Sequence, residues 1–349
     1  MSRNLRKVIV ATVLLGLVIM GGFAYYVYNS VFSKNTAFTN KEAHLYIPTG
    51  ANFNEVLEQI EPLVINIDSF IAIAKKKGYP ENIKSGHYII KEGMSNNDII
   101  NTIRSTNIPI LVKFNNQERI ENLAGHLSRQ LEPDSLSFLN AFKEVTFLEN
   151  AGFTEETALG MYIPNTYEVY WNTSAANFRD RMLKEYNAFW TNERNLKAQK
   201  QGLSRDQVMA LAAIVQKETA KVDERPRVAG VYLNRLKAGM LLQADPTVIY
   251  AKKKTENDFN QTIKRVLYAD LEIDSPFNTY KYTGVPPGPI SMPDISAIDA
   301  VLNPESHHYF YFVADVTNFG YHKFAKTLAQ HNANKAEYVR WISQNGVNR

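Results

Sequence analysis

The sequence predicts an α+β protein with an N-terminal transmembrane helix, a small α+β module and a larger C-terminal α+β domain. An uncharged apolar run occupies residues 8–28, and a strand–turn–helix pattern occurs twice within residues 45–103. Helical and strand patterns then follow without a regular βαβα alternation. The 349 residues exceed one typical domain, and the 45% hydrophobic and 21% charged content is that of a globular protein.

The composition excludes several classes of protein. The formal net charge of +4 is small and no arginine-rich stripe is present, so the sequence predicts no nucleic-acid partner. The absence of cysteine excludes disulfides, thiol nucleophiles and cysteine-ligated metals. The sequence also lacks the motifs of a serine nucleophile elbow, a phosphate-binding loop and a dinucleotide-binding loop. It therefore predicts neither a metal nor a cofactor.

The N-terminus predicts a membrane anchor. Residues 1–7 carry three basic side chains and are predicted to be a cytoplasmic tail, because basic residues remain on the cytoplasmic side of a membrane span. Residues 8–28 are long enough to cross the bilayer core and end in tyrosines. A cleavable signal peptide is the alternative, but the bulky sequence FAYYVY occupies the expected cleavage site. Residues 29–43 are predicted to be a linker. The rest of the chain is predicted to lie on the periplasmic (extracytoplasmic) side of the plasma (inner) membrane.

Residues 44–106 predict a small module built on a repeat. The stretch LYIPTGANFNEVLEQI (Leu45–Ile60) resembles YIIKEGMSNNDIINTI (Tyr88–Ile103), and Gly50 aligns with Gly93, 43 positions later. A fainter copy starting at Leu111 keeps the strand and the helix but lacks the glycine. Such strand–turn–helix units resemble LysM modules, which bind glycan chains. A generic βα unit with a glycine turn is the alternative.

Residues 107–200 predict a helix-rich connecting region, and residues 201–349 the C-terminal domain. The aromatic stretch MYIPNTYEVYW in the connecting region alternates as a strand or extended loop does. The polar sequence NERNLKAQKQG precedes the boundary near residue 200.

Glu218 stands out in the C-terminal domain. Ser204 and Gln207 form an S-x-x-Q capping box, and Leu211, Ile214, Val215 and Glu218 then follow at helical spacing. A solvated glutamate near a helix end is the ordinary explanation. The alternative is a general acid, because burial among apolar groups and the negative end of the helix dipole both raise a carboxyl pKa. A glutamate that stays protonated near neutral pH can donate to a leaving oxygen.

The polar residues downstream fit a carbohydrate site. Gln243, Asp245 and Thr247 interrupt apolar sequence after a helix that Gly239 is predicted to end, and the Pro/Gly-rich loop 275–290 carries Asn278 and Tyr280. A strand is predicted over 307–315, and His322 follows it. Each residue also has a simpler explanation: Asp245 could cap a turn, Tyr280 could only pack, and the histidines match no zinc spacing.

Long motifs of the C-terminal domain resemble the endolytic murein transglycosylase family, also called YceG-like or MltG. The shared motifs are IVQKETAK, ERPRVAGVYLNRLKAGMLLQADPTVIYA, SPFNTYKYTGVPPGPIS and NPESHHYFYFVAD, with a later His-Lys-Phe. The resemblance covers nearly the whole chain, from anchor through LysM-like module to a YceG-like α+β catalytic domain. Two positions depart from the family: Asn165 replaces the acidic residue of its P-D-T-Y motif, and Tyr321 replaces the glycine before the late histidine.

The resemblance implies a lyase that cuts the MurNAc-β-1,4-GlcNAc bond of peptidoglycan without water and leaves 1,6-anhydro-MurNAc ends. Glu218 of the K-E-T motif corresponds to the catalytic residue of the family. Peptidoglycan glycan strands and the plasma membrane are the implied partners, with peptidoglycan synthases (penicillin-binding proteins) as further candidates. The implied role in the cell is to terminate the elongation of glycan strands. The implied reaction needs no cofactor. The candidate substrate-binding residues are Asn234, Gln243, Asp245, Thr247, Asn278, Tyr280 and His322.

Three other functions are compatible with parts of the sequence. A muramidase-type hydrolase would need a second carboxylate, for which Asp245 and Glu224 are the candidates. A LysM-like cell-wall-binding scaffold would need no catalytic acid. A pyridoxal-phosphate lyase would need a Schiff-base lysine and a phosphate cradle, and the predicted anchor and the missing cradle disfavour it.

Overall fold

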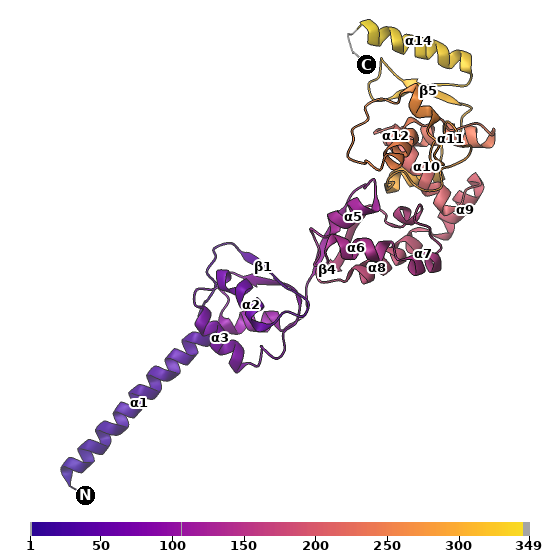
Figure 1. Cartoon of the computed structure of the whole chain (residues 1–349). Coiled ribbons are helices and arrows are strands. Elements are labelled where there is room, and N and C mark those ends of the chain that lie inside the picture. The colour runs from indigo at the N-terminus through magenta and orange to yellow at the C-terminus, as the bar shows by residue number, and fades with distance from the viewer. Residues whose placement is uncertain (1, 106, 345–349) are drawn as a thin grey trace. The chain divides into compact units, whose positions relative to one another are not determined.

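The computed structural model describes residues 2–105 and 107–344, which form two compact units (Figure 1). The N-terminal unit consists of Met1–Val112, Gln130–Glu132 and Tyr167–Thr173. The C-terminal unit consists of Lys113–Arg129, Pro133–Thr166 and Ser174–Arg349. Most of the predicted connecting region 107–200 therefore packs with the C-terminal domain and does not form a part of its own.

The chain begins with the long helix α1 (Arg3–Phe32), none of whose side chains is buried. Among the residues that the structure describes, it is the one helix long and apolar enough to cross a membrane, with a mean hydropathy of 2.3. The helix continues beyond residue 28, so the prediction of a linker over 29–43 is wrong in its first part. Two residues of the following stretch are packed: Asn35 and Thr36 are buried, and the Asn35 side-chain amide donates to Asn96 Oδ1 at 2.6 Å.

The N-terminal unit confirms the predicted repeat. Strand β1 (Glu42–Ile47) pairs antiparallel with β2 (Gly86–Lys91), from Glu42 opposite Lys91 to Ile47 opposite Gly86. Each strand is followed by a glycine in the left-handed region, with φ of 78° at Gly50 and 83° at Gly93, and by a helix that starts with a capping box. These helices are α2 (Phe53–Ile60) and α4 (Asn96–Ile103), with η1 (Glu61–Leu63) and α3 (Ile67–Lys76) between α2 and β2.

Apolar side chains from both copies of the repeat meet in one core. Leu45 and Tyr88 of the strands, and Val56 and Ile99 of the helices, are at most 1% exposed. Only glycine adopts the left-handed turn without a steric cost, so the two glycines let each helix fold back on its strand. The repeat in the sequence is thus a repeat of local structure.

The C-terminal unit is mainly helical. It contains α5 (Ile120–Leu127), α6 (Ser135–Phe142), α7 (Val145–Ala151), η2 (Ala158–Met161), α8 (Ala175–Phe189), α9 (Asn192–Gln201), α10 (Arg205–Glu218), α11 (Arg225–Lys237), α12 (Asp245–Thr255), η3 (Tyr268–Glu272), α13 (Ile295–Leu302) and α14 (Leu328–Gln344). Strands β3 (Pro109–Phe114) and β4 (Asn165–Tyr170) pair with each other, and the division between the units falls within both. Strand β4 lies within the aromatic stretch, for which a strand or an extended loop is predicted.

Helix α10 runs through the core of this unit. All residues from 208 to 215 are buried, and the helix packs against α9, α11, α12 and α13. The prediction of a single apolar stripe was therefore wrong, because the middle of α10 is covered on every side. Alanines at 210, 212 and 213 explain how this happens: small side chains let neighbouring helices approach faces that lack large apolar groups.

The predicted strand 307–315 is much shorter in the structure. Strand β5 (Tyr311–Ala314) forms an antiparallel hairpin with β6 (His322–Ala325), and α14 packs against both strands. Before β5, the carbonyl groups of His307 and Tyr309 accept hydrogen bonds from the Asn234 amide of α11. Because these two carbonyls accept hydrogen bonds from a helix side chain, they are not used for strand pairing. Strand β5 therefore starts only at Tyr311.

Candidate functional site

Glu218 is the last residue of α10, and its carboxyl opens into a cavity of about 310 Å³. The helix starts at the predicted capping box, where Ser204 N–H donates to Gln207 Oε1 at 2.9 Å. The middle of α10 is buried, whereas its last turn reaches the surface at Lys217 and leaves Glu218 partly exposed to the cavity. The cavity is lined by Glu218, Tyr232, Arg235, Gln243, Asp245, Tyr280, Tyr311, Phe312, Leu328 and His331.

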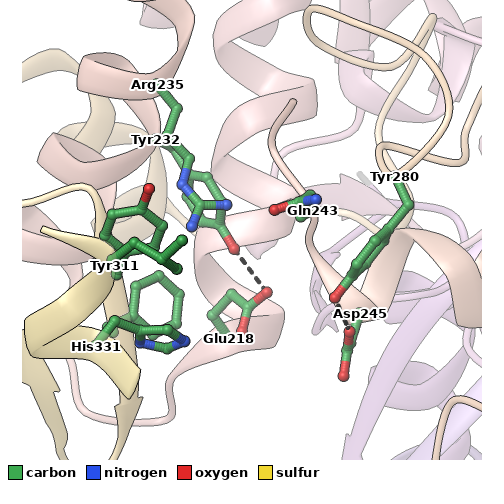
Figure 2. A pocket seen from close by; sticks show the side chains of 10 residues that line it. Glu218, Tyr232, Arg235, Gln243, Asp245, Tyr280, Tyr311 and His331 are labelled. Carbon is green, nitrogen blue, oxygen red and sulfur yellow. Dashed lines mark hydrogen bonds between the residues drawn. The ribbon is translucent and has the colours of Figure 1, made fainter. Parts of the chain in front are cut away.

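Tyr232 holds one oxygen of the Glu218 carboxyl. Its hydroxyl donates to Glu218 Oε1 at 2.7 Å, as Figure 2 shows. Tyr232 is 1% exposed, and its ring packs edge-on against Phe312 at a centroid distance of 5.9 Å. A phenol fixed in this way holds the carboxyl in one orientation, and Oε2 takes no part in this hydrogen bond.

The surroundings favour the neutral form of Glu218. Burial raises the pKa of its carboxyl to about 7, and the charge of Asp245 acts in the same direction. The hydrogen bond from Tyr232 and the charges of His322 and Arg235 oppose this rise in pKa. A carboxylic acid with a pKa near neutrality can give a proton to a substrate and take one back at physiological pH.

Arg235 ties two walls of the cavity to α11. Its Nε donates to the carbonyl of Phe310, just before β5, and its Nη1 donates to the carbonyl of Leu242, both at 2.7 Å. Its side chain is 7% exposed, so these hydrogen bonds form with little competition from water. Tyr232 and Arg235 are three residues apart on α11 and therefore face the cavity together.

Asp245 and Tyr280 form a second carboxyl–phenol pair in the same cavity. The Tyr280 hydroxyl donates to Asp245 Oδ1 at 2.7 Å, and Figure 2 shows this pair apart from the Glu218–Tyr232 pair. Asp245 is the first residue of α12 and is solvent-exposed, whereas Glu218 is only partly exposed. The cavity therefore combines one carboxyl in a desolvated setting with another in a hydrated one. That difference in environment separates acid from carboxylate roles in glycosidases.

Four of the predicted substrate-binding residues do not line this cavity: Asn234, Thr247, Asn278 and His322. Asn234 donates to the carbonyls of His307 and Tyr309, and Asn278 donates to those of Leu271 and Ile273. Thr247 is fully buried and donates to the carbonyl of Ala244 at 2.7 Å. Their polar groups hold loops in place around the cavity. Gln243, Asp245 and Tyr280 are the predicted residues that the structure brings together with Glu218.

His322 lies outside the lining and is paired with Glu224. The His322 N–H donates to Glu224 Oε1 at 2.7 Å, and its ring Nδ1 lies 2.8 Å from Oε2. Burial alone would raise the pKa of Glu224, but these hydrogen bonds from His322 hold it below its ordinary value. Glu224 is 4% exposed and does not line the cavity, so its carboxylate serves to hold His322 in place.

Six residues of the cavity are not predicted from the sequence. They are Tyr232, Arg235, Tyr311, Phe312, Leu328 and His331. Helical spacing would have placed the first two on one face, but nothing local shows that this face meets Glu218. The last two lie on α14, where the imidazole of His331 stacks on Tyr311 at a centroid distance of 5.3 Å.

Comparisons with known proteins agree with this architecture. The sequence profile of the YceG-like family matches residues 45–337. A Bacillus subtilis protein named endolytic murein transglycosylase is 29% identical over 345 residues, which cover 93% of this chain and 91% of that protein. A Streptococcus pneumoniae protein of the same name is also 29% identical, over 94% of this chain, but the chain spans only 64% of its length.

A solved structure shows the same fold. The 2.6 Å crystal structure of a YceG-like protein from Listeria monocytogenes matches with a TM-score of 0.56 and 27% sequence identity. The match covers 84% of this chain and 99% of the Listeria chain. The profile match extends over most of the chain, from β1 into α14. The chain therefore belongs to the YceG-like family.

Proposed function

We propose that this chain is a peptidoglycan lytic transglycosylase that cuts the MurNAc-β-1,4-GlcNAc bond of glycan strands from within. The observation that carries the proposal is the Glu218 carboxyl, whose pKa burial raises to about 7 and whose Oε1 is held by Tyr232. The names of the Bacillus and Streptococcus relatives support the same activity. Termination of growing glycan strands is the proposed role in the cell.

One carboxyl is enough for both halves of the proposed reaction. Glu218 first protonates the glycosidic oxygen as its bond to C1 of the muramyl sugar breaks. The resulting carboxylate then removes the proton from the C6 hydroxyl of that sugar, whose oxygen bonds to C1 and closes the 1,6-anhydro ring. Glu218 ends the cycle protonated, and no water is consumed. A pKa of about 7 suits a group that both gives and receives a proton.

The other cavity residues have proposed roles that follow from their positions. Asp245 and Tyr280 present a hydrogen-bonded carboxylate and phenol to a sugar. Gln243 contributes an amide. Tyr232 orients Glu218, and Arg235 supports the walls through backbone carbonyls. The acid proton of Glu218 is then carried by Oε2, because Oε1 accepts the Tyr232 hydrogen bond.

A muramidase-type hydrolase is the second candidate, and the position of Asp245 favours it. Asp245 lines the same cavity as Glu218, so it could activate water or act as a nucleophile. Glu224, the other carboxylate considered, is bound by His322 outside the lining and is no longer a candidate. The two reactions differ in whether an oxygen from water enters the product.

Product analysis separates these candidates. Full-length protein in detergent is incubated with purified glycan strands in water enriched in heavy oxygen, and the new ends are measured by mass spectrometry. We expect anhydro ends that carry no heavy oxygen and resist reduction by borohydride. Ends that carry heavy oxygen and are reducible would establish hydrolysis. Intact strands, with the protein still bound to them, would establish a wall-binding scaffold.

We propose further that α1 anchors the protein in the plasma membrane, with residues 1–7 in the cytoplasm and 8–28 as the span. The basic residues before the span and the tyrosines at its end support this orientation. Protease added outside intact spheroplasts should degrade the C-terminal unit, while a cytoplasmic marker protein stays intact. Survival of the C-terminal unit until the membrane is broken would reverse the topology. Cleavage of the mature protein after residue 28 would identify a signal peptide.

A further inference from the structure

Gln243 has a backbone conformation that glutamine rarely adopts. Its φ is +48°, and within residues 2–105 and 107–344 the only other non-glycine residue with positive φ is Asn257. Asparagine tolerates the left-handed region because its short side chain bonds to the local backbone, whereas glutamine has the ordinary steric cost of a Cβ. Glycine would satisfy the same turn without that cost. The presence of a glutamine here needs an explanation.

The turn around Gln243 is held by its neighbours and not by the Gln243 side chain. Its N–H donates to the carbonyl of Thr279 at 3.0 Å. The preceding residue, Leu242, is fully buried, and its carbonyl accepts from Arg235. The following residue, Ala244, is also fully buried and donates to Thr279 Oγ1 at 3.0 Å. The main chain would therefore keep this path with glycine or alanine at 243, because neither residue removes these hydrogen bonds.

The Gln243 side chain points into the cavity with its amide free. Figure 2 shows the amide between the Glu218–Tyr232 pair and the Asp245–Tyr280 pair. The residue is exposed, and in the described part of the chain its amide has no hydrogen-bond partner. An amide offers one acceptor and two donors. That set can donate to the carbonyl of an acetamido group or accept from its N–H.

We propose that Gln243 is a substrate-contact residue whose strained backbone is retained because its amide binds the 2-acetamido group of the sugar beside the cleaved bond. The inference rests on the proposed function for the identity of the sugar. Strain that the surroundings impose at a binding site, where an unstrained residue would fit, is a sign that the side chain is needed. The site then selects N-acetylated sugars over their deacetylated forms.

The test separates strain from ligand contact. Three variants are prepared in a Glu218→Gln background, which prevents turnover: Gln243→Gly, Gln243→Ala and, as a matched control, Asn257→Gly. Affinity for N-acetylated and chemically deacetylated glycan strands is measured for each, together with the melting temperature. Because the readouts are affinity and melting, they do not depend on whether the unmodified protein cleaves its substrate.

Both Gln243 variants should bind N-acetylated strands about tenfold more weakly than the parent, because a site that bonds a substrate amide loses that bond. Their preference for N-acetylated over deacetylated strands should fall by the same factor. Gln243→Gly should melt about 2 °C above Gln243→Ala, since only glycine relieves the strain. Asn257→Gly should leave affinity unchanged.

Two results would overturn the proposal. An unchanged preference for N-acetylated strands in both Gln243 variants would show that the amide does not read the acetamido group. Equal melting temperatures for Gln243→Gly and Gln243→Ala would show that the backbone at this position stores no strain. Failure of the proposed function would look different: the unmodified protein would release no anhydro ends, whatever the Gln243 variants bind.

Discussion

Replacement of Glu218 by glutamine is expected to slow glycan cleavage by about a hundredfold to ten-thousandfold, the range that a general acid contributes. Glutamine keeps the shape of the side chain and can still accept from Tyr232, but it has no acidic proton to give. Glu218→Asp should also fail, because the shorter side chain moves the acid by about 1.5 Å in a geometry that tolerates little displacement. The rate of release of anhydro ends measures the effect.

A matched control comes from the same helix. Lys217 precedes Glu218 and is exposed, so Lys217→Gln should leave the rate unchanged. Circular dichroism of each variant verifies that it is folded. A folded Glu218→Gln protein that cleaves at a nearly normal rate would contradict the assignment of the acid. Asp245 would then be the next residue to test, because it also lines the cavity.

The pH dependence provides an independent check with a defined sign. The acid must be protonated at the start of the cycle, so kcat/KM should fall as pH rises through about 7. The Tyr232 hydrogen bond lowers the pKa of Glu218, so Tyr232→Phe should move this fall to higher pH. The charge of Asp245 raises the pKa, so Asp245→Asn should move the fall to lower pH. Shifts in the same direction would contradict this account.

The groups that face Glu218 come from every wall of the cavity. They are Tyr232 and Arg235 of α11, Asp245 of α12, Tyr280, Tyr311 of β5 and His331 of α14, while the charge of His322 acts on Glu218 from outside the lining. The folded-state pKa of Glu218 is raised, so its contribution to stability is present in acid and lost as pH rises through about 7. Glu218→Gln removes the titration and should therefore be more stable than the unmodified protein in alkaline solution.

Replacement of Asp294 by alanine is expected to lower the free energy of unfolding by about 3 kcal/mol. This is the low end of the range for breaking a buried ion pair, because Asp294 is about one-third exposed. Asp294 accepts from Arg225 Nη1 at 2.7 and 2.8 Å and caps α13 by accepting from the Ala297 N–H. Arg225 is only 6% exposed, so its guanidinium would remain buried without its partner.

The loss should extend to the site, because α13 packs against both α10 and α11. Asp134→Ala is the matched control: Asp134 caps α6 by accepting from the Ser137 N–H at 2.7 Å but has no buried cation, and its loss should cost about 1 kcal/mol. Urea denaturation measures both variants. Equal losses would show that the Arg225 pair adds nothing to the cap.

The stability difference should also depend on pH. Burial alone would raise the pKa of Asp294, but the hydrogen bonds and charge of Arg225 and the cap hold it below its ordinary value. A depressed pKa stabilises the fold above the unfolded-state pKa, and this stabilisation is lost as pH falls through the folded-state pKa. The gap between the unmodified protein and Asp294→Ala should therefore close in acid.

The sequence by itself determined the features that depend on neighbouring residues. The apolar run predicted α1, the capping box at Ser204 predicted the start of α10, and the aligned glycines Gly50 and Gly93 predicted two equivalent turns. These signals are local, because helix caps, left-handed turns and membrane spans are specified within a few residues or one continuous stretch. The motifs around Glu218 likewise pointed to the family, which the profile match confirmed.

Only the tertiary structure decided which polar side chains reach the cavity. Asn278 and Gln243 are equally plausible sugar-binding residues by type. The Asn278 amide donates to two backbone carbonyls, whereas the Gln243 side chain lines the cavity. Tyr232 meets Glu218 only because α10 and α11 pack together, and His331 joins them from α14. An amide or hydroxyl bonds a carbonyl of the chain as readily as a ligand. Which partner it bonds depends on segments far apart in the sequence, so the partner cannot be predicted from a local sequence pattern.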